Sequence, residues 1–119
     1  MGHLNLDGDE DGLFRRMPLL IEYKDRLFPS MSLQLAIKHM GGRLKDLAVG
    51  RNFFGQPALR IKHLEIATDD AYRILMNYDS KWTRERTYSF VDVLHGSLDP
   101  AIFRNKIILI GVTGEGVAP

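Results

Sequence analysis

The sequence lacks cysteine, a long apolar run and an excess of charge of either sign. Without cysteine the chain can form neither a disulfide framework nor a thiolate metal site. The longest apolar run covers only residues 107–112, far short of the ~20 residues that span a bilayer. The 16 Lys and Arg residues nearly balance the 15 Asp and Glu residues. We therefore expect neither a membrane span within these residues nor nucleic acid as a partner.

The remaining composition is that of a folded domain. Hydrophobic residues make up 45% and charged residues 26% of the 119 positions, which are ordinary values for globular proteins. A chain of this length can bury roughly two-thirds of the surface that it exposes when unfolded. We predict one domain over residues 1–119, either complete or part of a larger domain.

A β-hairpin is predicted at the start of the chain. Residues 2–6 alternate between apolar and polar side chains, and residues 7–12 form an acidic, glycine-containing turn. Residues 13–23 are rich in apolar side chains, with Pro18 indicating an edge position or a bulge. The order of strand, turn and returning strand favours a hairpin.

A helix is predicted over residues 31–40. Ser30 is a suitable N-cap, and Leu33, Ile37 and Met40 recur at the spacing of one helix face. Gly41 and Gly42 follow as a C-terminal stop. We interpret residues 43–57 as a loop, because glycine and proline interrupt them. Residues 59–67 predict one bent strand or two short ones, residues 74–78 another strand, and residues 80–86, which include Trp82, a surface loop.

The C-terminal part predicts a second helix followed by a buried strand. Ser89 is the expected N-cap, and the apolar face comprises Phe90, Val93 and Leu94. Residues 107–112 are apolar except for Gly111, which is typical of a strand covered on both faces. The predicted fold class is α/β of the α+β type: a mixed, mainly antiparallel sheet with two principal helices.

The acidic turn resembles the opening of a calcium-binding loop. Residues 7–12 read Asp-Gly-Asp-Glu-Asp-Gly, but the twelfth loop position, where calcium requires a bidentate carboxylate, is Pro18. Arg15 and Arg16 also place positive charge where ligands are needed. A solvated turn in which Asp11 pairs with one of these arginines is the favoured interpretation. The four histidines share no ligand spacing, so no metal site is expected.

Catalysis and nucleotide binding find little support. His95, Ser97 and Asp99 have the residue types of a hydrolase triad, but a triad draws its members from separate elements aimed at one another. Turn residues at the end of the second helix are the better interpretation. Residues 111–116 are glycine-rich after an apolar segment but lack the Lys-Ser/Thr pair of a phosphate-binding loop. We therefore predict no catalytic residue and no cofactor.

Three segments carry a family resemblance. They are GHLNLDGDEDGLFRRMPLLIEY at 2–23, ILMNY at 74–78, and YSFVDVLHG at 88–96 together with KIILIG at 106–111. In this order they resemble the CHASE2 family, the extracytoplasmic sensor domains of bacterial receptors. The likeness covers nearly the whole chain, which looks like the C-terminal portion of that longer domain. Asn105 stands where the family pattern has glycine before lysine.

The resemblance implies a non-catalytic input domain outside the cytoplasmic membrane. In such receptors transmembrane helices join it to an adenylate or guanylate cyclase, a histidine kinase or a Ser/Thr kinase. The domain would be the periplasmic part of an inner-membrane protein, itself soluble, and would bind a small molecule whose identity the sequence does not give. Candidate ligand-binding residues are Asp9, Asp11, Arg15 and Arg16, which are interpreted first as a salt-bridged hairpin and second as a ligand-facing rim.

Two other functions stay open at this point. The domain could serve receptor dimerisation or assembly without a small-molecule ligand, and a homodimer is one form that this would take. An enzyme built on His95 and Asp99, or on the acidic turn, is the third interpretation. A deep pocket with convergent carboxylates or imidazole would favour the enzyme, whereas a location in a surface turn would exclude it.

Overall fold

The computed structural model describes residues 2–6, 8–78 and 86–112. The chain divides into two compact units, residues 1–79 and 80–119, and each is considered by itself. The prediction of a single domain over residues 1–119 stays a prediction. Most of the loop predicted at 80–86, including Trp82, lies outside the described residues.

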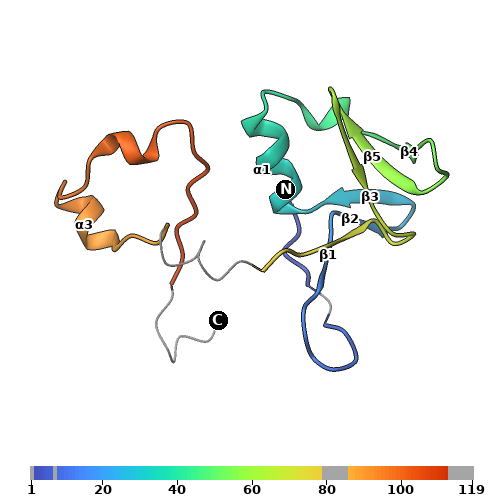
Figure 1. The fold of residues 1–119 in the computed structure, drawn as a ribbon, viewed down its shortest axis with the longest axis horizontal. Coiled ribbons are helices and arrows are strands. Elements are labelled where there is room, and N and C mark those ends of the chain that lie inside the picture. Colours follow the sequence, from blue (N-terminus) through green and yellow to red (C-terminus); the bar gives the residue numbers. More distant parts are fainter. Residues whose placement is uncertain (1, 7, 79–85, 113–119) are drawn as a thin grey trace. The chain divides into compact units, whose positions relative to one another are not determined.

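The first unit contains one α-helix and three small antiparallel sheets (Figure 1). Strand β1 pairs with β7, β2 pairs with β3, and β4, β5 and β6 form a three-stranded sheet in that order. The predicted mixed α+β fold is thereby confirmed. In chain order the elements are β1 (Arg16–Pro18), β2 (Leu20–Tyr23), β3 (Arg26–Pro29), α1 (Met31–His39), the 3₁₀ helix η1 (Leu44–Asp46), β4 (Ala48–Arg51), β5 (Pro57–Ile61), β6 (Leu64–Ala67) and β7 (Arg73–Leu75).

The predicted N-terminal hairpin is wrong in its pairing. Residues 2–6 make only an isolated parallel bridge, in which the His3 N–H donates to the Pro29 carbonyl at 3.1 Å and the Met31 N–H donates to the His3 carbonyl at 2.9 Å. Strand β1 instead pairs with the distant β7, with Arg16 opposite Leu75. Alternating side chains identify a strand surface but not its partner, so local sequence could not reveal this non-local pair.

The interpretation of residues 43–57 as a loop is also wrong in part. Residues 48–51 form β4, whose Val49 lies opposite Leu59 of β5. β4 is an edge strand with mostly exposed side chains, so it lacks the alternating apolar pattern that marks a half-buried strand. For residues 59–67 the alternative of two short strands is confirmed: β5 and β6 meet at a tight turn where Lys62 has a φ of 53°.

Helix α1 forms where the sequence predicts it. The Leu33 N–H donates to the Ser30 hydroxyl oxygen at 3.1 Å, which satisfies one of the free donors of the first turn. At the other end Gly41 adopts a φ of 67°, and the Gly42 N–H donates to the Ile37 carbonyl at 2.9 Å. This glycine-dependent stop leaves Leu33 and Ile37 on the buried face.

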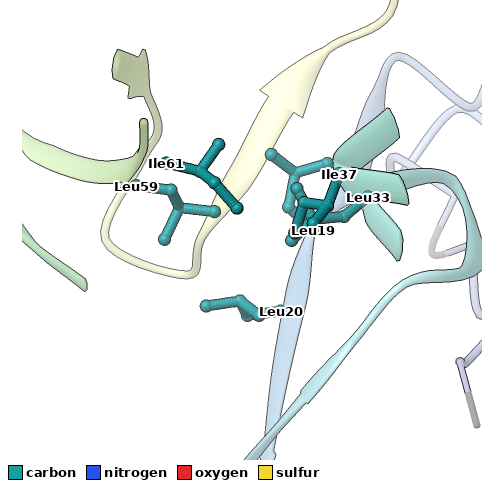
Figure 2. Packing of buried hydrophobic residues seen from close by; sticks show 6 residues of the cluster. All are labelled: Leu19, Leu20, Leu33, Ile37, Leu59 and Ile61. Carbon is teal, nitrogen blue, oxygen red and sulfur yellow. The ribbon is translucent and has the colours of Figure 1, made fainter. Parts of the chain in front are cut away.

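One aliphatic cluster holds the sheets and the helix of the first unit together (Figure 2). Its members come from α1, from β5 and from the chain around Leu19, which lies between β1 and β2. The Leu19 backbone also links the elements, because its N–H donates to the Tyr72 carbonyl and its carbonyl accepts from the Ser30 N–H. The buried cluster consists of Leu19, Leu20, Leu33, Ile37, Leu59 and Ile61.

Within residues 86–112 the second unit contains two short helices, α3 (Phe90–Leu94) and the 3₁₀ helix η2 (Pro100–Phe103). Helix α3 begins after Ser89 as predicted, although the Ser89 side chain makes no capping hydrogen bond. In η2 the Asp99 carboxylate accepts the Ala101 N–H at 2.8 Å. None of the helices in the described ranges is long and apolar enough to cross a bilayer.

Two predictions for the second unit are wrong. The apolar face of α3 is not buried, since Phe90 is 57% and Leu94 67% exposed. Residues 107–112 form no strand, and Ile110 is 80% exposed. A strand needs a neighbour for its N–H and C=O groups, and residues 86–112 contain no second strand that could supply one.

Because the first unit has a buried core and residues 107–112 are exposed, replacing leucine by alanine should affect stability differently in the two units. Leu59→Ala removes a fully buried side chain and should lower the free energy of unfolding by about 3 kcal/mol. Leu109→Ala truncates a leucine that is 70% exposed and should change it by no more than about 0.5 kcal/mol. Urea unfolding of the 119-residue chain measures both, and similar losses for the two variants would contradict the described core.

Candidate functional site

The acidic turn is a loop closed by its own hydrogen bonds. The Asp9 N–H donates to the Leu13 carbonyl and the Gly12 N–H donates to the Asp9 carbonyl, both at 2.8 Å. The Leu13 N–H donates to Asp11 Oδ1 at 3.1 Å. Gly12 has a φ of 78°, which glycine adopts without strain. The turn predicted for these residues is therefore formed, although it leads into β1 rather than joining two paired strands.

The structure brings all four predicted site residues together. Arg15 Nη1 lies 3.0 Å from Asp9 Oδ2 and 3.0 Å from Asp11 Oδ1, and Arg15 Nη2 lies 2.7 Å from Asp11 Oδ2. Arg15 thus forms a bidentate salt bridge with Asp11 through Nη1 and Nη2, and Nη1 also donates to Asp9. Arg16 Nη1 is 3.8 Å from Asp9 Oδ1, an ion pair without the close contact of a hydrogen bond. The predicted salt-bridged turn is present.

These charges influence one another while staying in contact with solvent. The Arg15 guanidinium, followed by the Leu13 N–H, lowers the pKa of the Asp11 carboxyl below its ordinary value of 3.8. Asp11, followed by Asp9, raises the pKa of Arg15. The side chains of Arg15 and Arg16 are both 48% exposed. Exposed ion pairs contribute little to stability, so the arrangement fixes the shape of the loop more than it stabilises the fold.

A shallow groove of about 410 Å³ lies beside the ion pair, lined by Leu13, Phe14, Arg15 and Tyr78. The Tyr78 hydroxyl donates to the Phe14 carbonyl, and the Met76 N–H donates to the Arg15 carbonyl at 2.8 Å. The segment after β7 is therefore tied to the loop. Spacing within the sequence did not associate Tyr78 with the loop; its only indication was that ILMNY and the acidic turn belong to the same family pattern.

A second open groove, of about 450 Å³, runs along α1 in the first unit. Gly2 lies close to the helix there, since a Cβ atom on it would come within 2.8 Å of the Met31 backbone. Gln34, Lys38 and Arg43 are among the lining residues. Sequence reasoning missed this groove, because it depends on the parallel bridge that lays the N-terminal segment against α1.

Metal binding and hydrolysis receive no support from the described residues. Within them no group of three or more His, Asp and Glu side chains is placed to hold a metal ion, and Arg15 occupies the carboxylates of Asp9 and Asp11. His95 is the C-cap of α3 and Asp99 the N-cap of η2, while the Ser97 N–H donates to the Asp92 carbonyl at 3.0 Å. The interpretation of this stretch as a turn is confirmed.

Comparison with known families identifies the class of domain. The family model described as CHASE2 domain matches residues 1–119, the whole chain. It defines a class of extracytoplasmic sensor domains. The chain belongs to the CHASE2 domain family, and the resemblance drawn from its sequence segments is confirmed. No curated protein and no solved structure matches the chain.

The geometry of the loop predicts which arginine controls the Asp11 carboxyl. Arg15→Gln should raise the pKa of Asp11 back toward 3.8, because the guanidinium is the main cause of its lowering. Arg16→Gln is the matched control and should leave it unchanged, since Arg16 pairs with Asp9 instead. NMR titration of the side-chain carboxyl carbons measures both variants.

The lowered pKa of Asp11 also determines how its contribution to the stability of the fold changes with pH. A carboxyl whose pKa is lower in the folded state stabilises the fold above its unfolded pKa, and this contribution is lost as the pH falls through the folded pKa. The Asp11 contribution should therefore decline below about pH 3.8 and be smaller in Arg15→Gln, where the Leu13 N–H still lowers the pKa of the carboxyl. An Asp11 pKa that moves equally in both arginine variants would contradict the assigned contacts.

Proposed function

We propose that residues 1–119 form the ligand-sensing input domain of a membrane-bound bacterial receptor, whose effector is an adenylate or guanylate cyclase, a histidine kinase or a Ser/Thr kinase. The domain lies on the periplasmic side of the inner membrane and is connected to its effector by flanking transmembrane helices. Membership in a family of extracytoplasmic sensor domains supports this role. The domain itself carries no catalytic function in this proposal.

The observation that supports a ligand site most directly is that Arg15 lines the groove, while Arg16 pairs with Asp9, a partner of Arg15. Arg16 is half exposed and has only a 3.8 Å ion pair with Asp9, so its guanidinium retains donors for an anionic group. The adjoining groove offers the apolar side chains of Leu13 and Phe14 and the ring of Tyr78. A small carboxylate or phosphate with an apolar portion fits this combination of charge and surface.

The contacts also provide a means of signalling. A ligand signals only if it binds two conformations with different affinity. An anion that draws Arg15 away from Asp9 and Asp11 removes the ion pairs that fix the loop. Since the Arg15 carbonyl accepts from Met76 and the Phe14 carbonyl from Tyr78, a change in loop shape acts directly on the segment after β7. Asp9, Asp11, Arg15 and Arg16 are thus the proposed ligand-responsive residues.

Thermal unfolding in the presence of carboxylates, phosphates and Ca²⁺ tests this proposal. A ligand at a hundred times its dissociation constant should stabilise the chain by about 2.7 kcal/mol, which raises the melting temperature by several degrees. Arg15→Ala and Arg16→Ala should abolish the shift. Arg43→Ala, the control, also breaks an exposed Arg–Asp pair but should retain it. A shift that survives both loop substitutions would contradict the assigned site.

Assembly is a second candidate function, favoured by the exposed apolar residues of the second unit. Leu109 and Ile110 are 70% and 80% exposed, and apolar surface of this kind is typical of protein–protein contacts. In this alternative the domain forms a homodimer through residues 107–112 and needs no small-molecule ligand.

Sedimentation velocity over a range of concentrations separates the two candidates. The assembly function predicts a dimer whose population increases with concentration and which Leu109→Ser combined with Ile110→Ser abolishes. Phe53→Ser combined with Phe54→Ser changes an equally exposed apolar pair of the first unit and should leave the dimer intact. A chain that is monomeric at every concentration would exclude assembly through this segment.

A further inference from the structure

The tip of the β4–β5 hairpin presents two aromatic rings to solvent. Phe53 is 96% and Phe54 82% exposed, which makes them the most exposed large hydrophobic side chains of the described residues. Their ring centroids lie 5.5 Å apart, edge to face. Neither ring packs into the buried cluster of the first unit, so the fold does not account for two adjacent phenylalanines at this position.

The loop that carries the rings is held in one shape. Asn52 Oδ1 accepts the N–H groups of Phe54 at 3.0 Å and of Gln56 at 2.9 Å, and the Asn52 N–H donates to the Gln56 carbonyl at 2.8 Å. Gly55 turns the chain with a φ of 77°, and its carbonyl accepts from Arg51 Nη1 at 2.6 Å. The backbone that carries the rings is thus held in one shape by hydrogen bonds within the loop, which lowers the entropic cost of ordering it on binding.

The charged side chains of the β4–β5 hairpin itself are basic. Residues 48–61 include Arg51 and Arg60 but no Asp or Glu. The Arg60 guanidinium donates to the Arg51 carbonyl near the tip and also pairs with Glu65 at 2.6 Å. Arg51 donates to a backbone carbonyl of the loop, and its positive charge has no carboxylate partner among the described residues. An apolar tip with the unpaired cation Arg51 behind it complements a surface that has an apolar interior and anionic groups at its boundary.

We propose that Phe53 and Phe54 insert into the head-group and upper acyl region of a bilayer that contains anionic phospholipids, with Arg51 at the level of the phosphates. The two rings stand out at the end of a hairpin, and neither of the two grooves described above includes them. A projecting apolar tip can enter a fluid interface directly, whereas a protein partner would need a matching pocket for both rings. This interaction does not depend on the proposed ligand site.

Cosedimentation with lipid vesicles tests the proposal on the 119-residue chain. The chain should bind vesicles of equal parts phosphatidylglycerol and phosphatidylcholine, and Phe53→Ser combined with Phe54→Ser should weaken binding by at least roughly tenfold, because two rings no longer leave water. Vesicles of phosphatidylcholine alone should bind about fivefold more weakly for each cation that acts at the surface. Circular dichroism should show an unchanged fold, since both rings are exposed.

Leu4 of the first unit supplies the control. Leu4→Ser removes a leucine that is 71% exposed and belongs to neither proposed site, and it should leave vesicle binding unchanged. Loss of binding in this control together with normal binding of the tip variant would overturn the proposal. If the chain bound neither the anionic vesicles nor those of phosphatidylcholine alone, the proposal would also be overturned. A protein would then be the partner of the tip.

A depth measurement tests insertion directly. Phe54→Trp in a Trp82→Phe background places the single tryptophan at the tip. Anionic vesicles should shift its emission to shorter wavelength, and lipids brominated on the acyl chains should quench it. Emission that stays unshifted and unquenched while the chain is bound would overturn the proposed insertion.

Discussion

Burial of six aliphatic side chains is the interaction on which the first unit depends (Figure 2). Each of its sheets has only two or three strands, and sheets of this size are not stable alone in water. Leu33 and Ile37 of α1 pack with Leu59 and Ile61 of β5, so the helix and the three-stranded sheet stabilise each other. Leu19 connects the two-stranded sheets β1–β7 and β2–β3 to this core through its buried side chain and its backbone hydrogen bonds.

This arrangement leaves the functional candidates outside the core. The acidic loop and the aromatic tip are both exposed and are both shaped by local hydrogen bonds rather than by burial. Asp11 and Asn52 perform similar tasks, since a side-chain oxygen of Asp11 accepts the Leu13 N–H and that of Asn52 accepts the N–H groups of Phe54 and Gln56. The core can therefore be conserved in shape while the chemistry of either loop changes, which is the usual separation between a scaffold and the sites that it carries.

Local patterns predicted the elements that are determined locally. Helix α1 and the salt-bridged acidic turn follow from side chains a few positions apart, so their spacing was sufficient. The pairing of β1 with β7 and the groove at Tyr78 depend on residues distant in the chain, which periodicity does not connect. The strand at 48–51 pairs locally with β5 but lies at a sheet edge with mostly exposed side chains, so it carries no apolar pattern. For residues 107–112 the local pattern predicted too much. Their apolar composition is that of a buried strand, but hydrophobicity alone supplies neither a strand to pair with nor side chains to pack over them.

The pairing of β1 with β7 has a mechanical consequence. The ladder contains three residue pairs, and beyond it, as far as residue 78, the Met76 and Tyr78 hydrogen bonds attach the outgoing chain to the loop. Tension applied at residue 78 would load these bonds in sequence, starting at Tyr78 and reaching the β-ladder before the aliphatic cluster. The contacts of residues 76 and 78 with the acidic loop would thus break under a pull that leaves the core intact.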